Sequence, residues 1–152
     1  MKRRYSILLF IMGVTLLMLN QIAYTQSNSI RVALDVSFGD RIIEQRVISF
    51  INRELRTFND IQIVESDLFI ESSEDIHLKI IGMEAKSAGG YMYGYAITAI
   101  IILPTYSQEN LIYAYWDSTM FTSPKDGLRS TSEDIIAWFD RNALEYIRDF
   151  IN

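Results

Sequence analysis

The sequence predicts one α+β domain: a two-layer sandwich in which a mostly antiparallel sheet of about five strands carries two helices on one face. Three observations favour this fold. The 152 residues suit a single domain. Hydrophobic residues make up 49% of them, which is enough for a core and too many for a disordered chain. Two stretches have helical periodicity, and short strand-like runs precede and separate them, so the expected order is β-α-β-β-β-β-α.

The first 25 residues are predicted to be a secretory signal peptide, with residues 26–152 as the single mature domain. Basic residues 2–4 precede an uncharged, mostly apolar run over residues 5–19. Ala23 and Thr25 suit the −3 and −1 positions of a cleavage site. Cleavage near Ser27 and a retained anchor are the alternatives, although the run is shorter than the roughly 20 residues that span a bilayer. The expected location is periplasmic or secreted, with membrane contact only through an uncleaved leader.

The charge and cysteine content exclude several classes of function. Removing the leader leaves 11 basic and 19 acidic residues, a net charge of −8, which argues against nucleic-acid binding. The chain has no cysteine, which excludes disulfides, thiolate metal sites, iron–sulfur clusters and a cysteine nucleophile.

The first half of the mature chain predicts a strand, a helix and a second strand. A short apolar run rich in β-branched residues predicts a buried strand over residues 30–36. Asp40 is expected to cap a helix over residues 41–58, where apolar residues recur at steps of three and four. A short strand over residues 61–64 and an acidic connection over residues 65–75 follow.

The second half predicts a three-stranded meander and a final helix. Strands are expected over residues 76–86, 91–103 and 111–121, with a tight reversal at residues 87–90. Expected loops over residues 104–110 and 122–130 hold the two prolines, Pro104 and Pro124. Thr131 or Ser132 is expected to cap the last helix, which has apolar residues at helical spacing from Ile136 to Phe150.

A register for the meander follows from its two reversals. Pairing Ala85 with Tyr91 and Leu103 with Leu111 places odd-numbered residues on one face and even-numbered residues on the other. The even face is expected to carry the helices and the odd face to stay partly open.

Tyrosines are the candidate binding residues, because five of them fall on the predicted odd face. They are Tyr91, Tyr93, Tyr95, Tyr113 and Tyr115. Two interpretations stay open. Tyrosine has high β-propensity and fills strands in ordinary sheets. It also suits a surface that alternates between water and a partner, including a second copy of the chain.

Motifs for metals, cofactors and catalysis are missing from the sequence. His77 is the single histidine, and the acidic segment 65–75 lacks the spacing of a calcium-binding EF-hand loop. We find no Gly-x-Ser-x-Gly, phosphate-binding glycine loop or His-Glu-x-x-His. We therefore expect no metal and no cofactor. Whether the protein is an enzyme stays open but leans to no, because the visible carboxylate pair, Asp117 and Glu84, is expected on opposite faces.

The order of elements resembles domains of bacterial envelope proteins. The segments that carry the resemblance are residues 31–36 (RVALDV), 53–56 (RELR) and 61–64 (IQIV). The chain is similar to the amino-terminal domain of the Tol-Pal system's periplasmic propeller protein, to the periplasmic domain of the curli-secretion lipoprotein and to outer-membrane activators of peptidoglycan synthases. The resemblance covers most of residues 30–151 and carries over no functional residue. It implies action through protein contacts. These families often carry a lipid anchor, which this cysteine-free chain lacks.

Together these features predict an exported, non-enzymatic protein-interaction module of the bacterial cell envelope. The tyrosine-bearing face or an exposed sheet edge is expected to dock an envelope protein or a second copy. One alternative is a small-ligand or glycan-binding domain, which a pocket lined by Tyr91, Tyr95 and Tyr115 would support. The other is a small hydrolase that uses two converging carboxylates.

Overall fold

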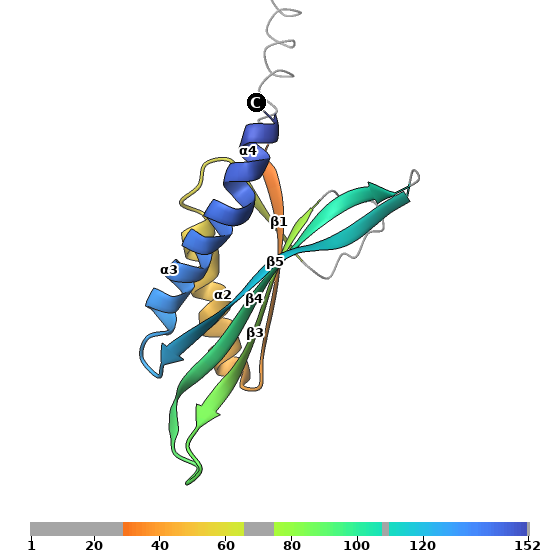
Figure 1. The fold of residues 1–152 in the computed structure, drawn as a ribbon. Coiled ribbons are helices and arrows are strands. Elements are labelled where there is room, and N and C mark those ends of the chain that lie inside the picture. Colours follow the sequence, from red (N-terminus) through yellow and green to blue (C-terminus); the bar gives the residue numbers. More distant parts are fainter. Residues whose placement is uncertain (1–28, 66–74, 108–109, 152) are drawn as a thin grey trace, which may run out of the picture.

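One five-stranded sheet and one helical layer make up the structure, a computed structural model that describes residues 29–65, 75–107 and 110–151. The helices lie on one side of the sheet, and the far end of the β4–β5 hairpin bends away from them (Figure 1). In chain order the elements are β1 (Ile30–Phe38), α2 (Arg41–Leu55), β2 (Ile61–Glu65), β3 (Ile76–Lys86), β4 (Met92–Ser107), β5 (Asn110–Pro124), α3 (Leu128–Phe139), the π-helical turn η1 (Asp140–Leu144) and α4 (Glu145–Ile151). The predicted leader and most of the acidic connection lie outside the described residues.

The sheet order is β2-β1-β3-β4-β5. Strand β1 pairs in parallel with both β2 and β3, and helix α2 makes the crossover from β1 to β2. The β3–β4 and β4–β5 pairings are antiparallel and longer. This arrangement confirms the predicted α+β sandwich of about five strands with its helices on one face.

Helix α2 begins where the sequence predicts. The Asp40 carboxylate accepts a hydrogen bond from the Ile42 backbone N–H at 2.7 Å, which satisfies one donor of the first turn. The helix ends at Leu55, three residues before the predicted end at residue 58. There the Thr57 hydroxyl donates to the Glu54 carbonyl at 2.6 Å, a local bond of the kind that competes with helix continuation.

The last helical segment begins at Leu128, so the predicted cap at Thr131 or Ser132 is wrong. The serine hydroxyls bond backwards to carbonyls instead of capping. Ser130 donates to the Gly127 carbonyl at 3.0 Å, and the buried Ser132 donates to the Leu128 carbonyl at 2.7 Å. From Leu128 the chain stays helical through η1 into α4.

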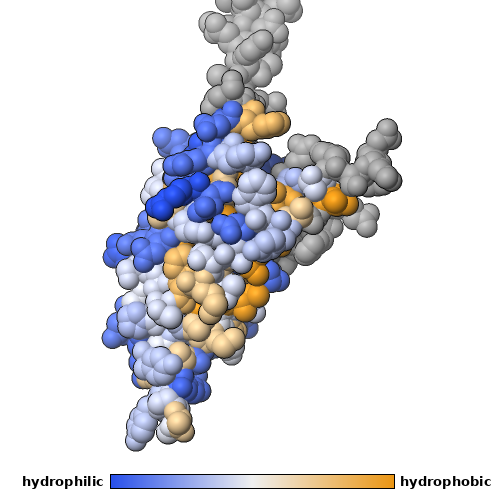
Figure 2. Space-filling view, in the orientation of Figure 1, coloured by the Kyte–Doolittle hydropathy of each residue, from blue (hydrophilic) through white to orange (hydrophobic). Residues whose placement is uncertain are grey.

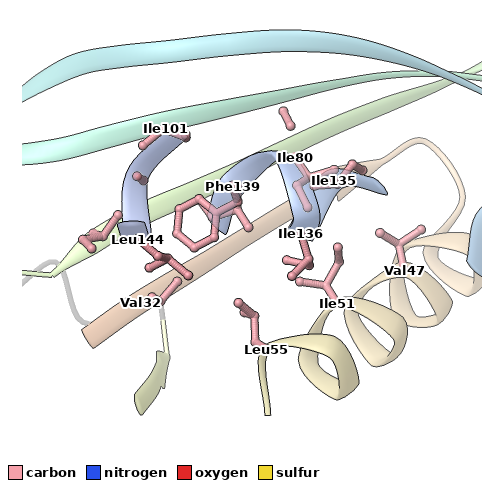
Figure 3. Packing of buried hydrophobic residues seen from close by; sticks show 14 of the residues in the cluster. Val32, Val47, Ile51, Leu55, Ile80, Ile101, Ile135, Ile136, Phe139 and Leu144 are labelled. Atoms are coloured by element: carbon pink, nitrogen blue, oxygen red, sulfur yellow. The ribbon is translucent and has the colours of Figure 1, made fainter. Parts of the chain in front are cut away.

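The core lies between the sheet and the helices. Figure 3 shows Val32, Ile80 and Ile101 from the strands packed towards Val47, Ile51 and Leu55 of α2 and towards Phe139 and Leu144 of the last helical segment. All of these side chains are almost completely buried. The apolar positions of both helices thus cover one face of the sheet, as their periodicity predicts.

The predicted register of the β3–β4 hairpin is wrong, because it places odd residues of both strands on the same face. Ala85 pairs with Gly94, not with Tyr91, and a register irregularity separates it from the Lys86–Met92 pair. The reversal is longer than predicted: Ser87 donates its backbone N–H to the Tyr91 carbonyl at 2.9 Å, and Gly90 takes a φ of 82°. The irregularity changes the parity, so that even residues of β3 from Glu84 back to Leu78 share a face with odd residues of β4, and Leu78 lies opposite Ile101.

The second hairpin is longer than predicted as well. Strands β4 and β5 continue to Ser107 and from Asn110, and Leu103 pairs with Ala114 rather than Leu111. Both prolines lie in strands, not in the predicted loops. Pro104 is tolerated because it lies past the last β3 partner, at Ile102, so one edge of β4 needs no donor there.

Candidate interaction surface

Strand β5 forms one outer edge of the sheet. It pairs with β4 along one side, and no other strand in the described part of the chain pairs with its second side. An outer strand presents backbone N–H and C=O groups that another strand can pair with, and exposed edges are normally guarded by charge, proline or short length. Strand β5 is 15 residues long and carries a single charged residue, Asp117.

Large apolar side chains on both faces of β5 are exposed. On the face without helices, hereafter the open face, Met120 is 73% exposed and Tyr115 is 64% exposed. On the helical side Trp116 is 44% exposed. Figure 2 shows the hydrophobic residues of this view gathered along the line of β5 and on the projecting hairpin, beside a hydrophilic helical side. The edge is therefore flanked by apolar surface above and below the sheet.

Trp116 connects β5 to the last helical segment. The contact lies at a β-bulge in β5 and at the π-helical turn η1. Trp116 has no partner in the β4–β5 ladder, where Asp117 pairs with Ile101 and Tyr115 with Ile102. This β-bulge lets its side chain turn towards η1. The indole N–H donates to the Asn142 carbonyl at 2.9 Å, and the indole ring lies 5.1 Å from that of Tyr146, centroid to centroid. The side chain of Trp116 thus joins the β-bulge of β5 to the last helical segment.

The open face continues the apolar surface of β5 into the sheet. Met120 lies opposite Thr98 of β4, which lies opposite Ile81 of β3. Met83, one row further along, is also exposed. The charges on this face are paired: the Lys79 ammonium lies 2.8 Å from an oxygen of Asp35. The result is a nearly neutral, largely apolar strip that runs inward from β5.

The five tyrosines do not share one face, so that part of the prediction is wrong. Tyr95 is 6% exposed, lies on the helical side and packs edge-on against Phe38, and burial raises the pKa of its hydroxyl. Tyr91 and Tyr93 are exposed at the β3–β4 reversal, and Tyr115 lies on the open face. Tyr113 pairs with Pro104 through its backbone, and its side chain lies outside the described residues. A binding role for these residues stays a prediction.

Tyr91, Tyr95 and Tyr115 do not line a common pocket. The structure therefore gives no support to the predicted small-ligand site between these three residues. Two of the pockets in the described part of the chain, neither of which the sequence revealed, border Tyr95. One, of about 270 Å³, lies between Phe38, Asp40 and Glu84. The other, of about 430 Å³, lies between Tyr93, Thr122 and Pro124. Neither is lined by Tyr115, so the tyrosines do not converge on one ligand site.

The candidate carboxylate pair is also separated, for a different reason than predicted. Glu84 lies opposite Tyr95 and Asp117 lies opposite Ile101, so both are on the helical side and not on opposite faces. Tyr95 and Ile101 are six residues apart on β4, which is roughly 20 Å along a strand. Paired carboxylates of glycoside hydrolysis lie within about 10 Å. Lys86 also pairs with Glu84, at 2.6 Å.

His77 lies inside the sheet, between Ala33 of β1 and Ile102 of β4. Burial lowers the pKa of its imidazole, and the nearby Asp75 and Asp35 carboxylates oppose this shift. Asp75 itself pairs with Arg31 at 2.8 Å. Across the described ranges, no three residues of metal-binding type form a cluster. No helix within the same ranges is long and apolar enough to cross a membrane.

The sequence predicts a strand over residues 111–121 and an exposed sheet edge as one docking surface, but it does not assign that edge to β5. The available signal was its composition: 15 residues with one charge, in the last strand of a meander that must end at a sheet edge. The predicted register aligns the tyrosines on one face and therefore favours them over this edge.

No protein-family model matches the chain, and no curated protein matches it. Among solved structures it is similar to the hypothetical protein CT253 of Chlamydia trachomatis, with 9% identity over 75% of this chain and 98% of that one and a TM-score of 0.47. A PelC dodecamer from Paraburkholderia phytofirmans has 11% identity, coverage of 75% and 86%, and a TM-score of 0.45. The rare lipoprotein B of Shewanella oneidensis has 14% identity, coverage of 79% and 97%, and a TM-score of 0.30. At these scores the likeness concerns the general fold and assigns no function.

Proposed function

We propose that the protein is an exported, non-enzymatic interaction module that binds a protein partner along β5. The observation that carries this proposal is the long edge with little charge. Strand β5 has one charge in 15 residues, no described partner on its outer side and exposed apolar side chains on both faces. Such an edge offers a partner both main-chain hydrogen bonds and side-chain contacts, as in binding by strand addition.

The leader-like amino terminus supports export, and export sets the kind of partner. A positive start, an uncharged apolar run and small residues near position 25 are the pattern of a secretory signal. In the periplasm or outside the cell, the partners available to β5 are envelope or secreted proteins and other copies of this chain. The acidic balance of residues 26–152 makes nucleic acid an unfavourable partner.

Site-specific photocrosslinking in the native host tests the proposal. A photoreactive phenylalanine analogue at Met120 is compared with the same analogue at Ile42, an exposed residue on the outer side of α2. We expect a discrete crosslinked product from position 120 and none from position 42. Equal crosslinking from both positions, or none from position 120, would overturn an interaction role for β5.

A further inference from the structure

The outer side of β5 has one regular stretch, Asp117–Ser123, with an interruption at each end. Before it, the bulge at Trp116 breaks the ladder with β4. After it, Pro124 ends the strand and has no backbone N–H to donate. Between these points each residue from 117 to 123 has a single partner on β4 without a register shift. A strand that adds to β5 therefore finds seven consecutive regular residues.

We propose that the occupant of this stretch is a second copy of the chain, paired β5 to β5, antiparallel and centred on Met120. This inference rests on the proposed function and names its partner. Met120 lies at the middle of the regular stretch and is its most exposed large residue, at 73%. A two-fold axis through Met120 places the bulge of each strand opposite the proline of the other. Pairing between the two copies then ends, on each strand, at the bulge and at the proline.

The parity of strand faces requires that a residue lie on the two-fold axis, and Met120 satisfies this requirement. Residues directly opposite each other in an antiparallel pair point to the same face, and faces alternate at every residue. A strand paired with its own copy must therefore have one residue facing itself. With Met120 on the axis, Ser118 lies opposite Thr122 and Thr119 lies opposite Phe121. These are small polar and aromatic pairs of the kind that stabilise neighbouring strands.

The charges are compatible with this pairing although the chain as a whole is acidic. Asp117 is the single charged residue of the regular stretch, and the two-fold axis places it opposite Ser123 of the copy. Like charges directly opposite each other would oppose pairing, and this register has none. A different axis, at Asp117 itself, would set the two carboxylates face to face.

The apolar flanks of β5 are continuous across the same axis. A two-fold perpendicular to the sheet keeps the helices of both copies on one side and joins the two open faces into one surface. Met120 then meets its copy on the open face. On the helical side Trp116, which contacts Tyr146, comes to lie beside the end of the partner's β5, where the partner's Pro124 terminates the strand. Side chains that are exposed in one copy gain neighbours in the pair.

Single cysteines test this register cleanly because the chain has no native thiol. In Met120→Cys the new thiols of two copies face each other, whereas in Ser118→Cys or Thr122→Cys each lies about 14 Å from its own copy. These matched controls are exposed on the same face. We expect mild oxidation of the purified protein to give at least about tenfold more disulfide-linked dimer from Met120→Cys than from either control alone. Mixing Ser118→Cys with Thr122→Cys should restore crosslinking.

Light scattering on the unmodified protein supplies an independent measurement, with an expected mass twice that of one chain. A mass of one chain at tens of micromolar, or equal crosslinking from all three cysteine variants, would overturn the inference. Neither result would remove the proposed function, which is tested by crosslinking in cells. A product from position 120 that contains a different protein would keep the function and reject the second copy.

Discussion

The two edges of the sheet differ in length, charge and exposure. Strand β2 has five residues, pairs with β1 alone among the described strands, and begins next to Asp60, which binds Arg148 of α4. Strand β5 is three times as long and carries Asp117 as its one charge. Short length and nearby charge are ways in which proteins guard an edge against pairing. Short length and nearby charge thus protect the β2 edge, whereas β5 is long and carries little charge.

One helical segment fastens both edges, with a different chemistry on each side. In η1, Asp140 lies 2.6 Å from a guanidinium nitrogen of Arg148, which also binds Asp60 beside β2. Two residues further on, the Asn142 carbonyl accepts the hydrogen bond of Trp116 from β5. The η1–α4 segment therefore holds the β2 side through ion pairs and β5 through a hydrogen bond and an aromatic contact. Separate substitutions can loosen either side.

Trp116→Ala should produce the largest loss of stability and should act on the β5 side. Replacing a fully buried aromatic residue by alanine costs about 3–5 kcal/mol, and the partial exposure of Trp116 reduces this to about 2 kcal/mol. Urea unfolding measures the loss. Hydrogen exchange should quicken in β5 and η1 and stay unchanged in β2. Trp116→Phe, which keeps a ring but loses the N–H donor, should cost about 1 kcal/mol. Equal acceleration of exchange at both edges would contradict separate fastening.

Arg148→Ala is the matching change on the β2 side. The guanidinium binds Asp60 and Asp140 and lies over the Phe58 ring, and all three charged side chains are partly exposed. We expect a loss of about 1–2 kcal/mol, between the values typical of surface and buried ion pairs. Arg148→Lys should recover only part of it, because lysine lacks the fork that binds two carboxylates. Exchange should quicken in β2 and α4 but not in β5.

The dependence of stability on pH provides a second test of the contact between Arg148 and Asp60. Hydrogen bonds from Arg148 lower the pKa of the Asp60 carboxyl in the folded state. The unfolded chain therefore binds this proton more readily, so the stabilisation is complete above about pH 4 and is lost as the pH falls further. Below that pH the gap in stability between the native protein and Arg148→Ala should narrow. A constant gap down to pH 2 would contradict a charge-based contact.

The fold was predictable from the sequence because its main signals are local. The helical spacing from Arg41 onward, the cap at Asp40 and the β-branched run at the start of β1 each determine their own element. The candidate surface was not predictable, because it depends on register. The register irregularity between Ala85 and Lys86 exchanged the partners of the residues in β4 beyond it and moved Tyr95 to the helical side. The bulge at Trp116 has no sequence signal at all, since a bulge is defined by the partner strand.

Met120→Lys transfers to β5 the kind of charge that guards natural edges. Because Met120 is largely exposed, the change should leave the stability of one copy within about 0.5 kcal/mol. It should weaken self-association at least about tenfold, because two lysines would lie opposite each other on the axis. Gln62→Lys, an exposed position on β2, is the matched control and should change association less than about twofold. Sedimentation equilibrium measures both. Equal weakening by the two variants would show that charge, not position, is responsible.

The mildest expected effect comes from His77, which lies on β3 between the two edges. Burial lowers the pKa of its imidazole in the folded protein, despite the Asp75 and Asp35 carboxylates. Below about pH 6.5 the unfolded chain therefore takes up the proton more readily, so stability should fall as the pH is lowered from 7 towards 5. In His77→Gln this slope should disappear. Because His77 pairs towards β1 on one side and β4 on the other, protonation should quicken exchange at both edges together. A response confined to one edge would mean that the sheet does not couple its two sides through β3.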